Sequence, residues 1–189
     1  MFTGIVTHTS KVIDIDLSQN KLIIVNEFHE LAIGMSISVD GACLTVSKFD
    51  INSITFDLSE ETISRTIISN YSKNTLVNLE LPVKHNSLFS GHIVLGHVDD
   101  IGTINEIKVV KGKLNDFYFT TTDDTYIIDK GSISINGISL TTNIKSDKLF
   151  YVSIIPETFK NTNFLTVNEN EEVNIEYDII GKYVYKFSK

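Results

Sequence analysis

The sequence has a single cysteine and no cluster of basic residues. The lone thiol, Cys43, excludes an intramolecular disulfide framework and any zinc site built on several thiolates. The 16 Lys and Arg residues are outnumbered by 24 Asp and Glu residues, which leaves a formal net charge of −8. Proteins that bind the nucleic-acid backbone normally carry a basic patch, so no nucleic-acid partner is expected.

Long apolar runs and targeting segments are also missing. No run approaches the ~18 apolar residues needed to cross a bilayer, and the first residues lack the basic-then-apolar layout of a signal peptide. The hydrophobic content of 42% and the charged content of 21% are typical of a soluble chain that buries a core. We therefore expect a soluble, cytoplasmic protein with no membrane partner.

The common cofactor and nucleophile motifs are absent as well. The sequence contains no GxGxxG, P-loop, GxSxG or HExxH pattern. Dinucleotide binding, nucleotide-phosphate binding and serine-hydrolase chemistry therefore have no support.

What the sequence does contain is two copies of one module. Residues 36–66 align without a gap with residues 132–162 at a constant offset of 96. Nearer the start the offset becomes 92, so that Gly4 corresponds to Gly96. A period of this length exceeds the ~20–50 residues of solenoid repeats and fits a tandem pair of small domains. The predicted division is residues 1–93, residues 94–182 and a short tail, residues 183–189.

The local patterns of each module favour strands. Alternating β-branched or aromatic residues end at turn residues, as in residues 21–25, and Asp-Gly at 40–41 and Asn-Gly at 136–137 are typical of tight turns. Strands spaced by ~8–12 residues indicate an antiparallel sandwich or barrel. Helical patterns are confined to residues 60–69, residues 157–163 and the C-terminus. The predicted fold is all-β, with two small barrels in tandem.

The C-terminal residues 179–187 place apolar side chains at i, i+1, i+4, i+5 and i+8, which is one face of a helix. Isolated helices shorter than ~12–15 residues rarely hold in water. This helix must therefore dock on its own barrels or on a partner chain; the alternative is a frayed end.

The two modules differ just after their Gly turns. Residues at i and i+2 of a strand share a face, so Cys43 and Thr45 face one side, as do Ser139 and Thr141 in the second module. Such polar pairs beside a glycine turn could line two related pockets. The alternative is that the threonines only fill a β ladder, where threonine is favoured.

Two histidines, His92 and His97, lie at the junction of the modules. A spacing of five along a strand would put their rings on opposite faces, and few other ligands are near, so no metal site is expected. Histidine beside glycine is better explained as a hydrogen-bonding or proton-transfer group, or as a structural residue.

Five segments together resemble the riboflavin synthase family: residues 1–6, 36–46, 91–99 (GHIVLGHVD), 130–141 (KGSI and NGISLT) and 155–158 (IPET). The resemblance covers nearly the whole chain. It implies two six-stranded Greek-key β-barrels, each holding one molecule of 6,7-dimethyl-8-ribityllumazine, and a short C-terminal helix. It also implies a transferase that dismutates two lumazines by moving a four-carbon unit, with riboflavin and 5-amino-6-(D-ribitylamino)uracil as products and no cofactor or metal.

Further expectations follow from the same resemblance. The reaction removes a proton from the C7 methyl of one lumazine and activates C7 of the other. The catalytic residues implied are His97, Ser139, Cys43, Thr45 and Thr141. The substrate-binding residues implied are Gly4, Ile5, Val6, Cys43, Leu44, Thr45, Asp57, Leu58, Ser59, Glu60, Glu61, Thr62, His97, Lys130, Ser139, Leu140, Thr141, Ile154, Ile155, Pro156, Glu157, Thr158 and Phe159, with Phe2 and Asp178 as further candidates.

Family members form homotrimers in which the first barrel of one subunit faces the second barrel of its neighbour. The chain ends soon after Lys182, where the family usually has a longer helix, so a weakened trimer is expected. Two other departures are Ser90, where the family often has glycine, and Ala42, where some members have a second cysteine. The main alternative function is a non-catalytic, antenna-type lumazine or flavin binder of the same fold; a purely structural β-protein is the third.

Overall fold

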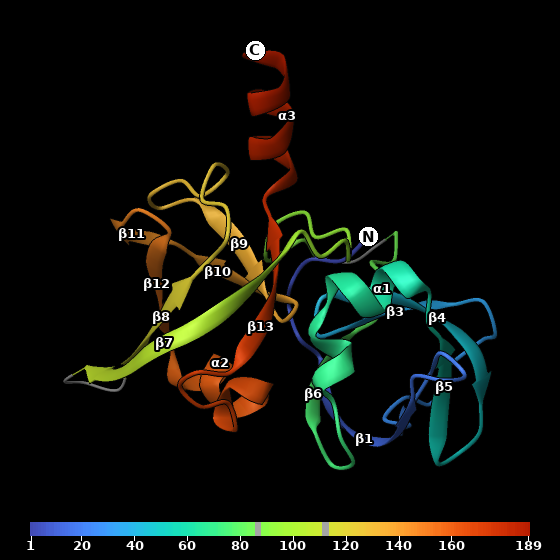
Figure 1. The fold of residues 1–189 in the computed structure, drawn as a ribbon. Coiled ribbons are helices and arrows are strands. Elements are labelled where there is room, and N and C mark those ends of the chain that lie inside the picture. Colours follow the sequence, from blue (N-terminus) through green and yellow to red (C-terminus); the bar gives the residue numbers. More distant parts are fainter. Residues whose placement is uncertain (86–87, 111–113) are drawn as a thin grey trace.

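The computed structural model describes residues 1–85, 88–110 and 114–189, which form two β-barrels side by side (Figure 1). The first barrel is closed, with strand order β1-β2-β5-β4-β3-β6 and antiparallel pairing between neighbours. Its strands are β1 (His8–Asp16), β2 (Lys21–Val25), β3 (Ser36–Val39), β4 (Ala42–Phe49), β5 (Ser53–Asp57) and β6 (Leu76–Glu80).

Period-two alternation builds the core of each barrel. In β5, Ile54 and Phe56 are fully buried, whereas the alternate residues Ser53, Thr55 and Asp57 are not. Leu22 and Ile24 of β2 pair with these two positions and fill the same interior. The first barrel thus buries a core of its own, separate from the apolar cluster of the second.

The second barrel is a seven-stranded sheet with order β10-β9-β13-β7-β8-β12-β11. Its strands are β7 (Asp100–Val110), β8 (Leu114–Thr120), β9 (Ser132–Ile135), β10 (Ile138–Thr141), β11 (Asn143–Ser146), β12 (Leu149–Ile154) and β13 (Glu172–Tyr177). The two edge strands, β10 and β11, are separated by one residue and together correspond to β4. The remaining strands follow the order of the first barrel.

Thr142 is the residue that divides this strand. Its backbone N–H donates to the carbonyl of Gly131 (3.0 Å), and its hydroxyl donates to the carbonyl of Ile128 (2.5 Å). The strand is therefore interrupted at Thr142, the residue that is hydrogen-bonded to the loop before β9. The predicted all-β tandem pair of barrels is confirmed, with one strand of the second barrel split in two.

The three predicted helical regions are also confirmed. Each barrel carries one short helix and one 3-10 turn, and a longer helix ends the chain. These elements are α1 (Glu60–Arg65) with η1 (Ile67–Asn70), α2 (Pro156–Asn161) with η2 (Asn163–Leu165), and α3 (Ile179–Phe187). Ser59 caps α1 by accepting a hydrogen bond from Thr62 N (3.0 Å), and Asp178 caps α3 by accepting from Ile180 N (3.0 Å).

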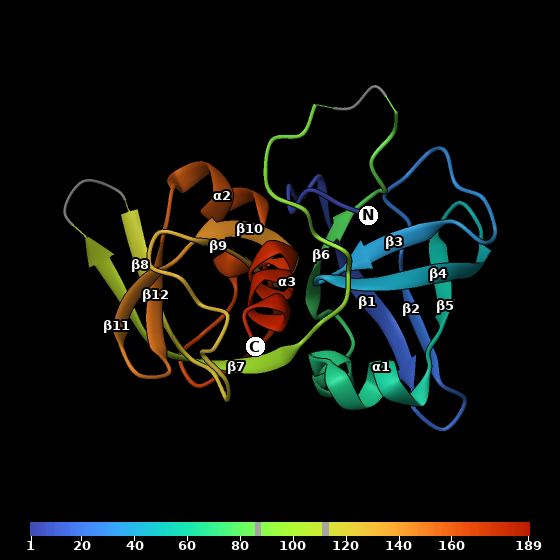
Figure 2. The same cartoon turned by 90° about the horizontal axis from the view of Figure 1, so that it is seen from above.

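Helix α3 extends away from both barrels (Figures 1 and 2). Its base is attached to the second barrel: Lys182 forms an ion pair with Asp99 (2.6 Å), and the ring of Tyr185 contacts that of Tyr126 at 5.4 Å. Two other apolar side chains of α3, Val184 and Phe187, are 63% and 83% exposed. Within the described residues, no helix combines the length and apolar character needed to span a membrane.

The barrels meet along a local two-fold relation. Gly41 and Gly137, both with positive φ, lie back to back, and a Cβ on either one would come within 2.8 Å of the backbone nitrogen of the other. The side chain of Asn78 accepts from Asn163 N (2.7 Å), and that of Asn174 accepts from Ile67 N (2.8 Å). The sequence repeat thus becomes a pseudosymmetric interface.

Candidate active site

Two segments cross between the barrels, and we call them the crossing segments: residues 1–6 and residues 93–98. They touch each other through an antiparallel bridge between Phe2 and Val94, in which Phe2 N donates to Val94 O (2.7 Å). Residues 1–6 lead into the first barrel, and residues 93–98 lead into the second. Each segment nevertheless binds a strand of the opposite barrel.

Two equivalent hydrogen bonds join each crossing segment to the opposite barrel. Ser139 N of the second barrel donates to Gly4 O (2.8 Å), and Cys43 N of the first barrel donates to Gly96 O (2.9 Å). Both glycines have positive φ, and a Cβ on Gly4 would lie 2.6 Å from Ser139 Cβ. A Cβ on Gly96 would lie 2.9 Å from Cys43 N and closer still to its Cβ. Both crossings therefore require glycine.

The first pocket has a volume of about 450 Å³ and lies between β4, α1 and the second crossing segment. Its lining residues are Ala42, Cys43, Ser59, Glu61, Thr62, Arg65, Thr66, Gly96, His97 and Val98. Cys43 is half-buried and His97 is exposed, so a thiol and an imidazole lie in the wall of one cavity. Five predicted residues (Cys43, Ser59, Glu61, Thr62 and His97) meet here.

At the corresponding place on the second barrel, Ser139 contacts a different histidine. His92 Nδ1 lies 2.7 Å from Ser139 Oγ, and Nε2 of the same ring is buried without a hydrogen-bond partner. Burial lowers the pKa of His92, and the Asp178 carboxylate offsets part of this effect. A neutral imidazole can accept the proton of the Ser139 hydroxyl.

The two histidines therefore belong to different sites, one beside Cys43 and the other beside Ser139. The sequence suggested that His97 assists proton movement and that Ser139 is near the reacting carbon. The structure places His97 in the pocket of Cys43 and gives Ser139 the neighbour His92. The two histidines are not on a continuous strand but in a loop whose one ladder contact is the bridge at Val94.

The outward faces of β4 and β10 are arranged as predicted. Cys43 and Thr45 share one face, with Thr45 exposed, and Ser139 and Thr141 share the matching face of the second barrel, with Thr141 exposed. Leu44, between the first two, is 3% exposed and lies in the barrel core.

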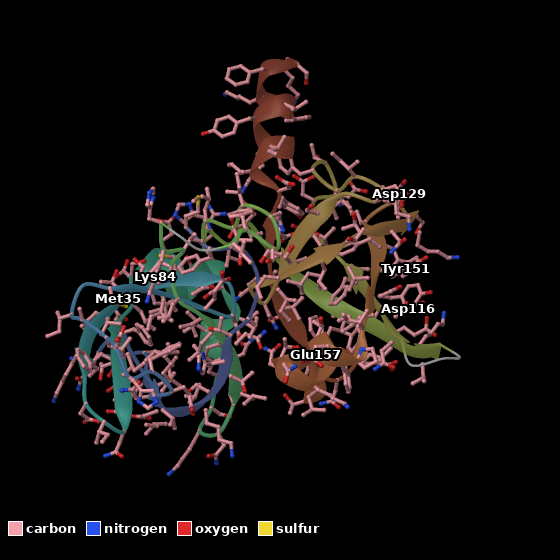
Figure 3. All side chains as sticks on the ribbon, turned by 180° about the vertical axis from the view of Figure 1, so that it is seen from behind. Met35, Lys84, Asp116, Asp129, Tyr151 and Glu157 are labelled. Carbon is pink, nitrogen blue, oxygen red and sulfur yellow. The ribbon has the colours of Figure 1, made fainter. Side chains whose placement is uncertain are left out.

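Other predicted binding residues lie in the segment from each barrel's β5 or β12 to its helix. Side chains of Leu58 and Ile154 are in the two cores, and Phe159 packs against Phe117 with ring centroids 6.4 Å apart. Asp57, Glu60, Ile155 and Glu157 are exposed; Figure 3 shows Glu157 on α2.

The remaining predicted residues border the second barrel. Gly4, Ile5 and Val6 form the crossing segment beside Ser139, and Lys130 hydrogen-bonds through Nζ to Asn143 Oδ1. Leu140, Pro156 and Thr158 are half-buried. Phe2 is fully buried at the crossing point, and Asp178 is the N-cap of α3.

Sequence reasoning did not assign a role to two glutamates. Glu80 is the last residue of β6, and Glu176 lies near the end of β13. Both are buried, and their carboxylates accept hydrogen bonds from the crossing segments. The available signal was the gapless alignment of residues 77–80 with residues 173–176, which repeats a glutamate at the end of an apolar run.

The fold and these sites define a class of protein: two tandem β-barrels, each with a polar site beside a segment from the crossing, the Cys43 pocket on the first barrel and the Ser139–His92 contact on the second. The Lumazine binding domain family matches residues 3–82 and 95–178. The chain belongs to this family. The predicted resemblance is confirmed, and both copies of the domain are present.

Several relatives in this family carry the name riboflavin synthase. The chain is 40% identical to that of Actinobacillus pleuropneumoniae over 195 residues, covering 99% of this chain and 89% of the relative. It is 35% identical to that of Bacillus subtilis with the same coverage. Among solved structures, LumP complexed with riboflavin has a TM-score of 0.83 at 23% identity, covering 94% of this chain and 99% of that one. That likeness supports the fold alone.

Proposed function

We propose that this protein is a riboflavin synthase, a transferase that moves a four-carbon unit between two molecules of 6,7-dimethyl-8-ribityllumazine. The products are riboflavin and 5-amino-6-(D-ribitylamino)uracil. The observation that carries the proposal is the pseudosymmetric pair of sites at Cys43 and Ser139, each beside a crossing segment, since a dismutation needs two related sites for two copies of one compound. The similarity to riboflavin synthases along almost the full chain supports the same conclusion.

The chemistry assigned to the protein is positioning and proton transfer. The lumazine ring delocalises the charge left when the C7 methyl loses a proton, so the protein needs no cofactor for that step. On the second barrel, the neutral His92 ring and the Ser139 hydroxyl can accept and return a proton through their 2.7 Å contact. At the first pocket, the Cys43 thiol faces the cavity and His97 lies in its wall.

The division into residues 1–93, residues 94–182 and the tail 183–189 is part of the proposal, as are the remaining predicted substrate contacts. We also propose a cytoplasmic homotrimer, in which the first barrel of one subunit faces the second barrel of its neighbour. The exposed apolar residues Val184 and Phe187 of α3 support association between copies of the chain. Because α3 spans only Ile179–Phe187, the association should weaken on dilution.

An antenna-type binder is the second candidate function. The chain shares its fold with LumP, whose structures contain riboflavin or 6,7-dimethyl-8-ribityllumazine. Such a protein would bind the lumazine without turning it over.

The test is to incubate the purified protein with 6,7-dimethyl-8-ribityllumazine and to follow riboflavin fluorescence together with release of the aminouracil. Riboflavin and aminouracil should appear in equal amounts. Ser139→Ala should lower kcat by about 10²-fold, because it removes the hydroxyl that contacts His92. Ser69→Ala, an exposed serine on η1, is the control and should leave kcat unchanged. Lumazine binding without any riboflavin would replace the proposal with the antenna function.

A further inference from the structure

Two buried glutamates hold the crossing segments, one from each barrel. Glu176 of β13 accepts three backbone hydrogen bonds: Oε1 accepts from Leu95 N (2.7 Å), and Oε2 accepts from Gly96 N (2.9 Å) and His97 N (3.0 Å). The residue is 2% exposed. One carboxylate of the second barrel therefore determines the backbone path of three consecutive residues.

Glu80 of β6 makes the equivalent contacts on the other side. Its Oε1 accepts from Thr3 N (2.7 Å) and from Thr3 Oγ1 (2.8 Å), and its Oε2 accepts from Gly4 N (2.9 Å). Glu80 is 5% exposed. The two glutamates differ in one donor: Glu80 binds the Thr3 hydroxyl where Glu176 binds a third backbone amide.

All six groups that contact Glu80 and Glu176 donate hydrogen bonds. The ionised carboxylate is therefore the form of these side chains that satisfies them. An ionised carboxylate only accepts hydrogen bonds, so each oxygen can satisfy several N–H groups at once. Burial raises the pKa of both carboxyls, while the donated hydrogen bonds favour the ionised form. A glutamine would turn an NH₂ group toward backbone N–H groups and leave donors facing donors.

Each anchored segment contacts the opposite barrel, beside Cys43 or beside Ser139. Gly96 and His97, held by Glu176 of the second barrel, line the pocket of Cys43 in the first barrel. Gly4, held by Glu80 of the first barrel, lies against Ser139 in the second. The positions of these segments depend on glutamates that do not belong to the barrel whose pocket they complete.

We infer that Glu80 and Glu176 are positioning residues that act crosswise: Glu176 sets the geometry of the Cys43 pocket in the first barrel, and Glu80 sets the approach of Gly4 to Ser139 in the second. For turnover, this inference rests on the proposed function. The inferred effect on geometry does not depend on that function, because the hydrogen bonds to Glu80 and Glu176 are independent of what the sites bind.

Cys43 provides a direct test, since it is the one thiol of the chain and lies in the first pocket. Alkylation of the folded protein by iodoacetamide reports how Gly96 covers that residue. Glu176→Gln should speed alkylation by about tenfold, as expected for loss of hydrogen bonds to a charged group. Glu80→Gln, an equally buried substitution, should change the rate by less than about twofold, because its segment contacts Ser139 and lies outside the pocket of Cys43.

The matched control is Glu172→Gln, on the same strand as Glu176. Glu172 also joins the barrels, by accepting a hydrogen bond from Asn70 Nδ2 (2.8 Å), but it is exposed and lies outside the first pocket. It should leave the alkylation rate unchanged. Equal acceleration by Glu80→Gln and Glu176→Gln would indicate general loosening and overturn the crosswise assignment, as would no acceleration by Glu176→Gln.

If Glu176→Gln fails to fold, Glu176→Asp keeps the charge but shortens the reach, and it should still accelerate alkylation while Glu80→Asp does not. A second measurement uses 6,7-dimethyl-8-ribityllumazine: each glutamine variant should weaken one of two binding sites and lower kcat. Absence of riboflavin from the wild-type protein would refute the proposed function and leave the alkylation result standing. Unaltered binding at both sites in both variants would contradict the positioning role.

Discussion

Asp40 is a buried carboxyl in the interface between the barrels, and replacing it by asparagine should change how stability depends on pH. It is 1% exposed and lies in the turn between β3 and β4. Its Oδ1 accepts from Asn78 N (2.7 Å) and Asn163 Nδ2 (3.1 Å), and its Oδ2 accepts from Tyr71 Oη (2.7 Å). None of these donors is a cation, and burial raises the pKa of Asp40 to about 7.

The sign and size of the effect follow from linkage. Between the ordinary pKa of 3.8 and the native value of about 7, the folded protein keeps the Asp40 proton and the unfolded chain loses it. Stability from this group is therefore present at low pH and is lost as pH rises, at about 1.4 kcal/mol per pH unit. Ionisation above pH 7 costs about 4 kcal/mol in all, the equivalent of roughly three pKa units.

Asp40→Asn removes the titration and keeps the contacts. The amide oxygen can accept from Asn78 N and Asn163 Nδ2, and the amide NH₂ can donate to the Tyr71 hydroxyl. The second barrel already carries Asn136 at the equivalent position, where it accepts from Asn174 N (2.8 Å). The variant therefore makes the two turns alike.

The assay is urea unfolding of the wild type and of Asp40→Asn at pH 5 to 8. The difference in free energy of unfolding, variant minus wild type, should increase by about 3 kcal/mol across this range and level off above pH 7. Titrations elsewhere in the chain are common to both proteins and cancel. A difference that stays constant from pH 5 to pH 8 would refute the reasoning, since Asp40 would then not titrate in this range.

Two further substitutions test the interface and the crossing. Asn136→Asp should destabilise the protein at pH 8 by more than the roughly 4 kcal/mol that ionised Asp40 costs the wild type, because within the described residues the Asn136 side chain accepts one hydrogen bond, from Asn174 N, whereas Asp40 accepts three. A loss in urea unfolding smaller than about 4 kcal/mol would contradict this. Gly96→Ala should lower the melting temperature more than Gly34→Ala. Both glycines have positive φ, which costs roughly 1–2 kcal/mol for alanine, but only Gly96 meets another residue, Cys43. Equal shifts in thermal unfolding would show that the close approach imposes no constraint.

Much of the fold could be predicted because its signals are local. The 96-residue repeat, the alternation in β2 and β5 and the Asp-Gly and Asn-Gly turns lie within short stretches of sequence. The split of one strand at Thr142 could not be predicted. It depends on hydrogen bonds from Thr142 to Ile128 and Gly131, which become neighbours only when the loop before β9 folds back.

The residues of the candidate site could be predicted from the sequence more readily than the contacts between them. Cys43, Thr45, Ser139 and Thr141 face outward as strand periodicity requires. The contact between Ser139 and His92 joins residues 47 positions apart and belongs to the crossing, so spacing along the chain carried no information about it.

The amino-acid sequence alone was sufficient to establish two related β-barrels and two related sets of polar side chains, because strand alternation and turn preference act over a few residues. It could not assign each histidine and each buried glutamate to a pocket. That assignment arises from the exchange of residues 1–6 and 93–98 between the barrels, which is held by long-range hydrogen bonds to Glu80 and Glu176. The bonds from Ser139 N to Gly4 O and from Cys43 N to Gly96 O complete this exchange, and they form only when both barrels are folded and packed together.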